Sequence, residues 1–157
     1  MDVSGYYDTF NVVLHDTLLS SGSGFVSDVS GLDPNFSYTL KVYPLNSSGN
    51  TNINNNEIGT VTFHTLPVLT DINYTNDASS VTILVDGVYD YINIYRGDEY
   101  ASFDTATLIA GSFSGNSYTD YMDPSVTNQN LFTYFVQPTD STGTILGDYL
   151  SIVGSTL

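Results

Sequence analysis

The chain has 157 residues, and 41% of them are hydrophobic, which is enough to bury a sizeable core. Cysteine is absent, so disulfide frameworks and thiolate metal sites are excluded. Two basic residues stand against 17 acidic ones, a formal net charge of -15, which makes nucleic acids and anionic membranes poor partners. No apolar run is long enough to insert into a membrane as a helix, and residues 1–5 lack the features of a signal peptide.

The first half of the chain alternates apolar and polar residues and is rich in β-branched and aromatic side chains, which favours strands over helices. We expect Val61 and Phe63 to face inward on the last strand of this half. The strands predicted here span residues 6–14, 18–19, 25–29, 38–43 and 58–65.

The stretch 31–49 combines a turn and a strand at fixed spacing. Proline at position 34 pins the turn, because it presets its own φ and biases the preceding Asp33 away from helix. Leu32 and Tyr38 bracket the turn, so the tyrosine ring can pack inward while its hydroxyl reaches back to the backbone near the corner. The inward positions of the strand are Tyr38, Leu40 and Val42.

In this order of features the stretch resembles a fibronectin type III domain. The hallmark of that family runs glycine-leucine, a turn with proline, a tyrosine, alternating apolar residues and a polar turn that ends in glycine. The resemblance implies an antiparallel β-sandwich of the immunoglobulin-like kind.

The second half of the chain repeats the first. Residues 7–12 match residues 89–94, and the pattern Val-x-Pro-x-Asn-Ser-Ser-Gly at 42–49 matches Val-x-Pro-x-Asp-Ser-Thr-Gly at 136–143 without a gap. The predicted strands of this copy span residues 68–74, 80–85, 89–96, 107–110, 117–121, 131–136 and 148–153. Seven strands in about 90 residues are typical of an immunoglobulin-like sandwich.

The sequence therefore predicts an all-β fold of two tandem fibronectin type III-like sandwiches, a partial domain at 1–66 and a complete one at 67–157. The first copy has no counterpart of the strands at 68–74 and 80–85, so we expect its two N-terminal strands to be supplied from elsewhere. Two sources stay open, namely upstream residues of a longer polypeptide and another chain that adds strands to the sheet. The second copy departs from the family pattern, because the chain has no tryptophan and Tyr121-Met122 replaces glycine-leucine before its corner.

No pattern of catalytic residues is found, so we expect a protein that is not an enzyme and uses no cofactor. His15 and His64 have no metal-ligand spacing, and no Gly-x-Ser-x-Gly nucleophile motif occurs. Asp120 with Asp123 is a weak candidate for calcium binding, since aspartate next to glycine or proline more often serves a turn.

Other candidate sites lie in loops. The predicted loop 98–105 holds Tyr100 and Phe103, two apolar residues in a polar segment, which would either contact a partner or cover the edge of their own sheet. An Arg-Gly-Asp tripeptide at 96–98 lies at the end of a strand before this loop, whereas in fibronectin type III domains an exposed tripeptide of this kind in a different loop can bind integrins. Asn-x-Ser/Thr sequons, candidates for glycosylation, occur at Asn35, Asn46 and Asn73.

These features predict a non-catalytic structural or interaction module, a spacer or adhesion unit with protein neighbours in a larger extracellular, cell-surface or virion-surface assembly. Its polar surface comes mainly from Ser, Thr, Asn, Asp and Tyr, because charged residues make up only 12% of the chain. The alternative is a carbohydrate-binding or accessory module of a secreted enzyme, which exposed tyrosines would favour.

Overall fold

The structure, a computed structural model, describes residues 9–14, 17–22, 29–45, 59–122 and 131–157. The chain divides into two compact units, Met1–Thr65 and Leu66–Leu157. The regular elements of the described residues are strands, apart from a short 3-10 turn, η1 (Phe103–Thr105), which confirms the all-β prediction. The strand predicted at 25–29 lies almost entirely outside the described residues.

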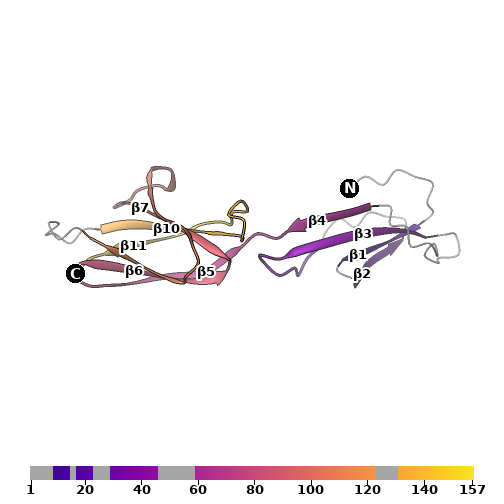
Figure 1. The fold of residues 1–157 in the computed structure, drawn as a ribbon, viewed down its shortest axis with the longest axis horizontal. Coiled ribbons are helices and arrows are strands. Elements are labelled where there is room, and N and C mark those ends of the chain that lie inside the picture. Colours follow the sequence, from indigo (N-terminus) through magenta and orange to yellow (C-terminus); the bar gives the residue numbers. More distant parts are fainter. Residues whose placement is uncertain (1–8, 15–16, 23–28, 46–58, 123–130) are drawn as a thin grey trace. The chain divides into compact units, whose positions relative to one another are not determined.

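The described part of the first unit is one antiparallel sheet of four strands in the order β2-β1-β3-β4 (Figure 1). The register places Val12 of β1 opposite Val42 of β3, and Tyr38 of β3 opposite Phe63 of β4. Val12, Val42 and Tyr38 are buried, as expected from the alternation of side chains along a strand. The strands are β1 (Thr9–Leu14), β2 (Thr17–Gly22), β3 (Ser37–Leu45) and β4 (Gly59–His64).

Val61 has the inward parity expected for it, but its side chain is not buried. Its Cα is paired with that of Leu40 on the neighbouring strand, so the side chain has the parity of the inward face, yet it is 43% exposed. The physical reason is its position on β4, which is an edge strand of the described sheet, so that among the described strands its side chain has a neighbour on one flank alone.

The second unit is a sandwich of two antiparallel sheets, which can be followed in Figure 1. One sheet has the order β5-β6-β9 and the other the order β11-β10-β7-β8. The strands of the first sheet are β5 (Val68–Asn76), β6 (Ser80–Val88) and β9 (Ser117–Tyr121). The strands of the second are β7 (Tyr91–Asp98), β8 (Thr107–Phe113), β10 (Leu131–Thr139) and β11 (Leu150–Ser155).

The core of this unit lies between its two sheets. β6 sends every second side chain inward, and β7 and β10 do the same from the facing sheet, as the period of two dictates. Because both inner faces are aliphatic or aromatic, their burial drives the sheets together. The buried members are Leu69, Ile72, Val81, Ile83, Val85, Ile92, Ile94, Tyr134 and Val136.

The four-stranded sheets of the two units share one pattern of pairing. The sequence overlay matches Val12 with Ile94 and Val42 with Val136, and the structure pairs Val12 with Val42 and Ile94 with Val136. The order β2-β1-β3-β4 thus corresponds strand for strand to β8-β7-β10-β11. The repeated residues therefore occupy the same places in two sheets of equal order.

An asparagine that the repeat also matches behaves differently in the two sheets. Asn93 of β7 accepts a hydrogen bond of 3.0 Å on Oδ1 from the backbone N–H of Ser112, whose φ of +50° belongs to an irregular stretch of β8. The equivalent Oδ1 of Asn11 is buried and has no hydrogen-bond partner among the described residues. Among the described residues, this hydrogen bond between the asparagine side chain and the neighbouring edge strand therefore forms in the second unit and not in the first.

Candidate functional site

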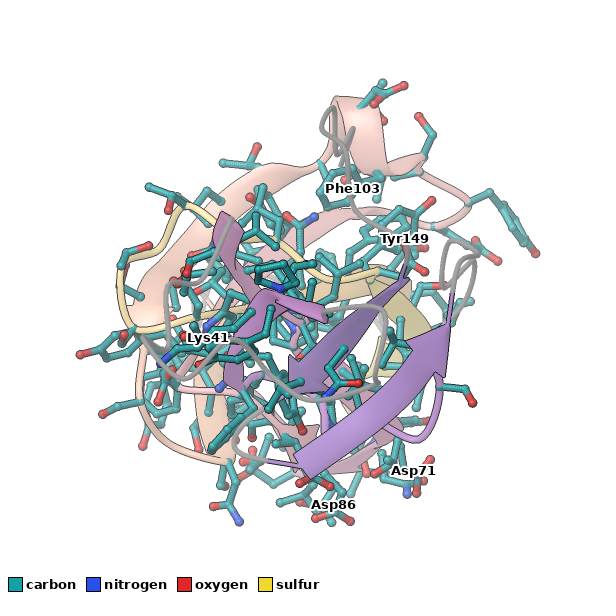
Figure 2. All side chains as sticks on the ribbon, turned by 90° about the vertical axis from the view of Figure 1, so that its right-hand side faces the viewer. Lys41, Asp71, Asp86, Phe103 and Tyr149 are labelled. Carbon is teal, nitrogen blue, oxygen red and sulfur yellow. The ribbon has the colours of Figure 1, made fainter. Side chains whose placement is uncertain are left out.

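An aromatic patch covers the outer face of the four-stranded sheet of the second unit. Strand alternation points Tyr95 of β7 and Phe135 of β10 away from the core, directly opposite each other. Phe103 of η1 folds over them, with its ring centroid 4.9 Å from that of Tyr95 and 5.7 Å from that of Phe135. Tyr149 stacks on Phe103 at 4.5 Å with an interplanar angle of 7°, and Figure 2 shows the two rings together. We call these four residues the aromatic patch.

The patch separates the two contact candidates of the sequence. Phe103 is half-buried and packs on its own sheet, which corresponds to the second of the two roles considered for it. Tyr100, three residues earlier, is 85% exposed. The loop returns closely over β7 at Gly97, since a Cβ there would lie 2.3 Å from the Ala101 Cβ. Phe103 therefore anchors the loop, while Tyr100 stands free of the sheet.

The backbone of Tyr100 is strained. Its φ of +65° lies in the left-handed region, which a bulky residue rarely adopts and which costs on the order of 1–3 kcal/mol. The neighbouring Glu99 carboxylate, as an acceptor for the phenol proton and as a negative charge, raises the pKa of Tyr100 above its ordinary value. An exposed ring is thus held in an unfavourable backbone conformation beside an acidic group.

A buried hydroxyl without a partner lies on the same face of the sheet. Thr133 shares the parity of Phe135 on β10 and is paired with Gly97 of β7 and Val153 of β11. The residue is 6% exposed, and its Oγ1 has no hydrogen-bond partner among the residues that the structure describes. Such a group is unfavourable by about 1–3 kcal/mol relative to a hydrated one.

The arginine of the Arg-Gly-Asp tripeptide is engaged within the domain. Arg96 Nη1 donates to Asp120 Oδ2 at 2.8 Å, and its guanidinium carbon lies 5.2 Å from the centroid of the Phe132 ring. The Tyr134 hydroxyl donates to the same carboxylate oxygen at 2.9 Å. Burial, followed by the charge of Asp120, raises the pKa of Tyr134 far above its ordinary value. The arginine needed for integrin-type recognition is therefore held by a buried carboxylate.

The same contacts disfavour calcium at Asp120. Its Oδ2 already accepts from a guanidinium and a hydroxyl, and the neighbouring positive charge would repel a cation. Asp123, the other candidate, lies outside the described residues. No group of three or more His, Asp or Glu side chains in the described ranges is placed to hold a metal ion.

The corner expected near Tyr38 has a defined geometry. The backbone N–H of Asp33 donates to the Tyr38 hydroxyl oxygen at 2.9 Å, and the Tyr38 ring centroid lies 4.9 Å from that of Phe36. Leu32 and Pro34 on either side of Asp33 are half-buried. In the second unit the overlay places Phe132 at the position of Tyr38, so this hydroxyl is missing and the ring lies beneath Arg96 instead.

Two of the three sequons lie in the described residues. Asn35 has a φ of +52°, and its Oδ1 lies 3.1 Å from Nε2 of His64, whose Nδ1 lies 2.8 Å from the Ser37 hydroxyl. Asn73 is exposed on β5, and its Nδ2 donates to Asp71 at 2.6 Å. The third, Asn46, lies outside the described residues, as does His15.

Sequence reasoning did not find Phe135 and Tyr149 as members of the patch. A signal for Phe135 was present in the sequence, because β10 carries apolar or aromatic residues at both parities. The structure agrees, since β10 is buried at four consecutive positions, 133–136. A strand with two apolar faces indicates that something covers the outer one. Tyr149 had no comparable signal, since it precedes its strand and meets Phe103 only through the fold.

Comparisons with known proteins gave a structural likeness at low sequence identity. No protein-family model and no curated protein matches the chain. A similar solved structure is the crystal structure of the FN1-FN3 domains of chicken CNTN1, with 14% sequence identity and a TM-score of 0.45. The match covers 96% of this chain and 57% of that one, so the chain spans little more than half of its length.

The class of fold follows from the strands themselves. The second unit, with three antiparallel strands packed on four around a shared core, is a fibronectin type III-like or immunoglobulin-like β-sandwich. In the described part of the chain, no helix has the length and apolar character needed to cross a membrane.

Proposed function

We propose that the chain is a non-catalytic interaction module, a spacer or adhesion unit in a larger extracellular, cell-surface or virion-surface assembly. Its contact surface is the aromatic patch together with Tyr100. The observation that carries the proposal is the exposure of Tyr100, 85%, in a backbone conformation that a tyrosine adopts only at a cost.

An exposed tyrosine in a strained conformation is suited to contact with a partner. An exposed, strained tyrosine adds nothing to the stability of the core of its own domain. To a partner it offers a large rigid ring with a polar tip. Tyrosine is enriched at the centres of protein interfaces for this reason. Tyr149, which is 45% exposed and fixed by stacking on Phe103, extends the same surface.

A carbohydrate-binding role is the second candidate, and one observation favours it. The ring of Tyr149 is immobilised by parallel stacking on Phe103, which is the kind of flat support on which a sugar ring can pack. The carbohydrate-binding role uses the same surface as the protein-interaction role and differs from it only in the ligand.

The experiment is a selection of peptides from a phage-displayed dodecapeptide library against the full chain, followed by binding measurements on variants. We expect Tyr100→Ser and Tyr149→Ser each to weaken the selected peptides by about tenfold or more, the usual loss at a contact hot spot. Tyr121→Ser is the matched control, because Tyr121 is 77% exposed on β9 of the other sheet. Peptides that depend on Tyr121 equally would contradict the proposal. The carbohydrate role would be favoured if cellohexaose or chitohexaose shifts the NMR resonances of Tyr149 and no peptide does.

A further inference from the structure

We propose that the partner segment that docks on the aromatic patch is cationic, with its lysine or arginine side chains seated against Tyr100 and Tyr149 and paired with the acidic residues around them. The inference rests on the proposed function and specifies the chemistry of the partner.

The acidic residues of this surface flank its aromatic residues in sequence. Asp98 and Glu99 precede Tyr100, Asp104 follows Phe103, and Asp148 precedes Tyr149. All four are exposed. Because Phe103 and Tyr149 stack at 4.5 Å, the fold also brings Asp104 and Asp148 to one region from positions far apart in the chain.

No positive charge of the second unit offsets these acids. Arg96 is the sole basic residue of the sequence between 66 and 157. Its guanidinium is bound to Asp120, whose side chain packs with Tyr134 of the inner face, so it is turned away from the patch. The patch is therefore an aromatic surface surrounded by negative electrostatic potential, which attracts cations and repels anionic partners.

The chemistry of the rings adds to the charge. Ammonium and guanidinium groups are attracted to the faces of aromatic rings, and the guanidinium plane also stacks on them. The chain already uses this contact internally, where Arg96 lies over Phe132. Exposed tyrosines with neighbouring carboxylates provide both halves of a site for such a side chain.

An independent observation also points to a ligand with hydrogen-bond donors. The Thr133 hydroxyl is buried on the same face of the sheet and has no hydrogen-bond partner in the described part of the chain. A lysine or arginine brings several donors and no acceptor, and a hydroxyl oxygen can accept from either. Thr133 is the strand partner of Gly97, the residue that precedes the acidic pair before Tyr100.

The experiment titrates the isotopically labelled full chain with three probes, namely a deca-arginine peptide, an uncharged Gly-Ser-Gln peptide of equal length, and cellohexaose. We expect deca-arginine alone to shift the amide resonances around Tyr100, Phe103 and Tyr149. Its affinity should fall by about tenfold or more in the variant Glu99→Gln/Asp104→Asn, and also as salt rises from about 50 to 200 mM.

The control variant removes the same charge from the other sheet. Asp71 of β5 and Asp86 of β6 are exposed and directly opposite each other, and Figure 2 shows them side by side. Asp71→Asn/Asp86→Asn should leave the affinity of deca-arginine within about twofold, since Coulomb effects at that distance are screened.

Each outcome decides between the two proposals. Equal loss of affinity in both double variants, or shifts spread over the whole surface, overturns the inference by showing unspecific attraction to a polyanion. Binding of the uncharged peptide at the patch with the same affinity overturns the cationic partner but keeps the interaction function. Binding of cellohexaose alone replaces both with the carbohydrate role, and the absence of any shift at the patch overturns both.

Discussion

Arg96→Met should destabilise the second unit far more than the loss of a surface charge does. Asp120 is 7% exposed, and the guanidinium is the counter-charge that makes its burial tolerable. Removing one partner of a buried ion pair typically costs about 3–5 kcal/mol, because the other charge stays buried without compensation, and the lower end of this range applies here because the Arg96 side chain is itself 33% exposed. For a domain of about 60–100 residues, 1 kcal/mol shifts Tm by about 4–8 °C, so a fall of at least about 12 °C is expected.

The loss of stability expected for Arg96→Met comes from leaving the Asp120 carboxylate buried without a counter-charge. It does not measure how much the ion pair itself stabilises the fold. A variant that removes all three polar partners, Arg96→Met/Asp120→Leu/Tyr134→Phe, leaves no buried charge and no unpaired hydroxyl. Replacing a buried ion pair by apolar side chains of similar volume is often neutral or stabilising. We therefore expect the triple variant to recover most of the stability that Arg96→Met loses.

Calorimetry of the full chain, with hydrogen exchange at the amides of β7 and β10, measures the stability of this unit. Arg96→Lys serves as the matched control, because it retains the charge while losing the planar donor fork, and it should lose less than Arg96→Met. An unfolding free energy of Arg96→Met within about 1 kcal/mol of that of the parent chain would contradict this prediction, since Asp120 would then behave like an exposed group. A triple variant as unstable as the single one would refute it equally.

Three further outcomes are expected. Tyr38→Phe should lower the unfolding free energy of the first unit by about 1 kcal/mol by removing the corner hydrogen bond, whereas Tyr43→Phe should not, as urea unfolding would measure. Thr133→Val should leave the Tm of the second unit unchanged or raise it, because an unsatisfied hydroxyl is replaced by a methyl group of similar size; a clear fall in Tm would reveal a partner for that hydroxyl. Burial acts to raise the pKa of Asp140, but hydrogen bonds such as that from the Ile145 N–H outweigh it and lower the pKa below its ordinary 3.8. The carboxylate therefore stabilises the fold above that pH and ceases to do so below it, so Asp140→Asn should flatten the decline of Tm measured as the pH falls below about 4.

The strands and their inward faces could be predicted from the sequence because they depend on local chemistry. A period of two in apolar residues and turn-forming residues at the ends specify a strand without reference to the rest of the chain. The match of 7–12 with 89–94 and of 42–49 with 136–143 likewise needed no coordinates, and these segments occupy equivalent places in two sheets of the same order.

The candidate site could be predicted only in part. Tyr100 and Phe103 stand out in a polar loop, but the sequence left open whether they contact a partner or cover the edge of their own sheet. The fold separates them, because Phe103 meets Tyr149 at 4.5 Å across 46 positions of the chain while Tyr100 remains exposed.

The sequence by itself determined the all-β class and the places of most strands, since both depend on residue type and spacing along the chain. Tertiary structure alone decided that Arg96 of the Arg-Gly-Asp tripeptide is held by Asp120, that Val61 is exposed and that four aromatic rings meet on one face of a sheet. The physical reason is that pairing between sheets and loops joins residues far apart in sequence, where local periodicity carries no information.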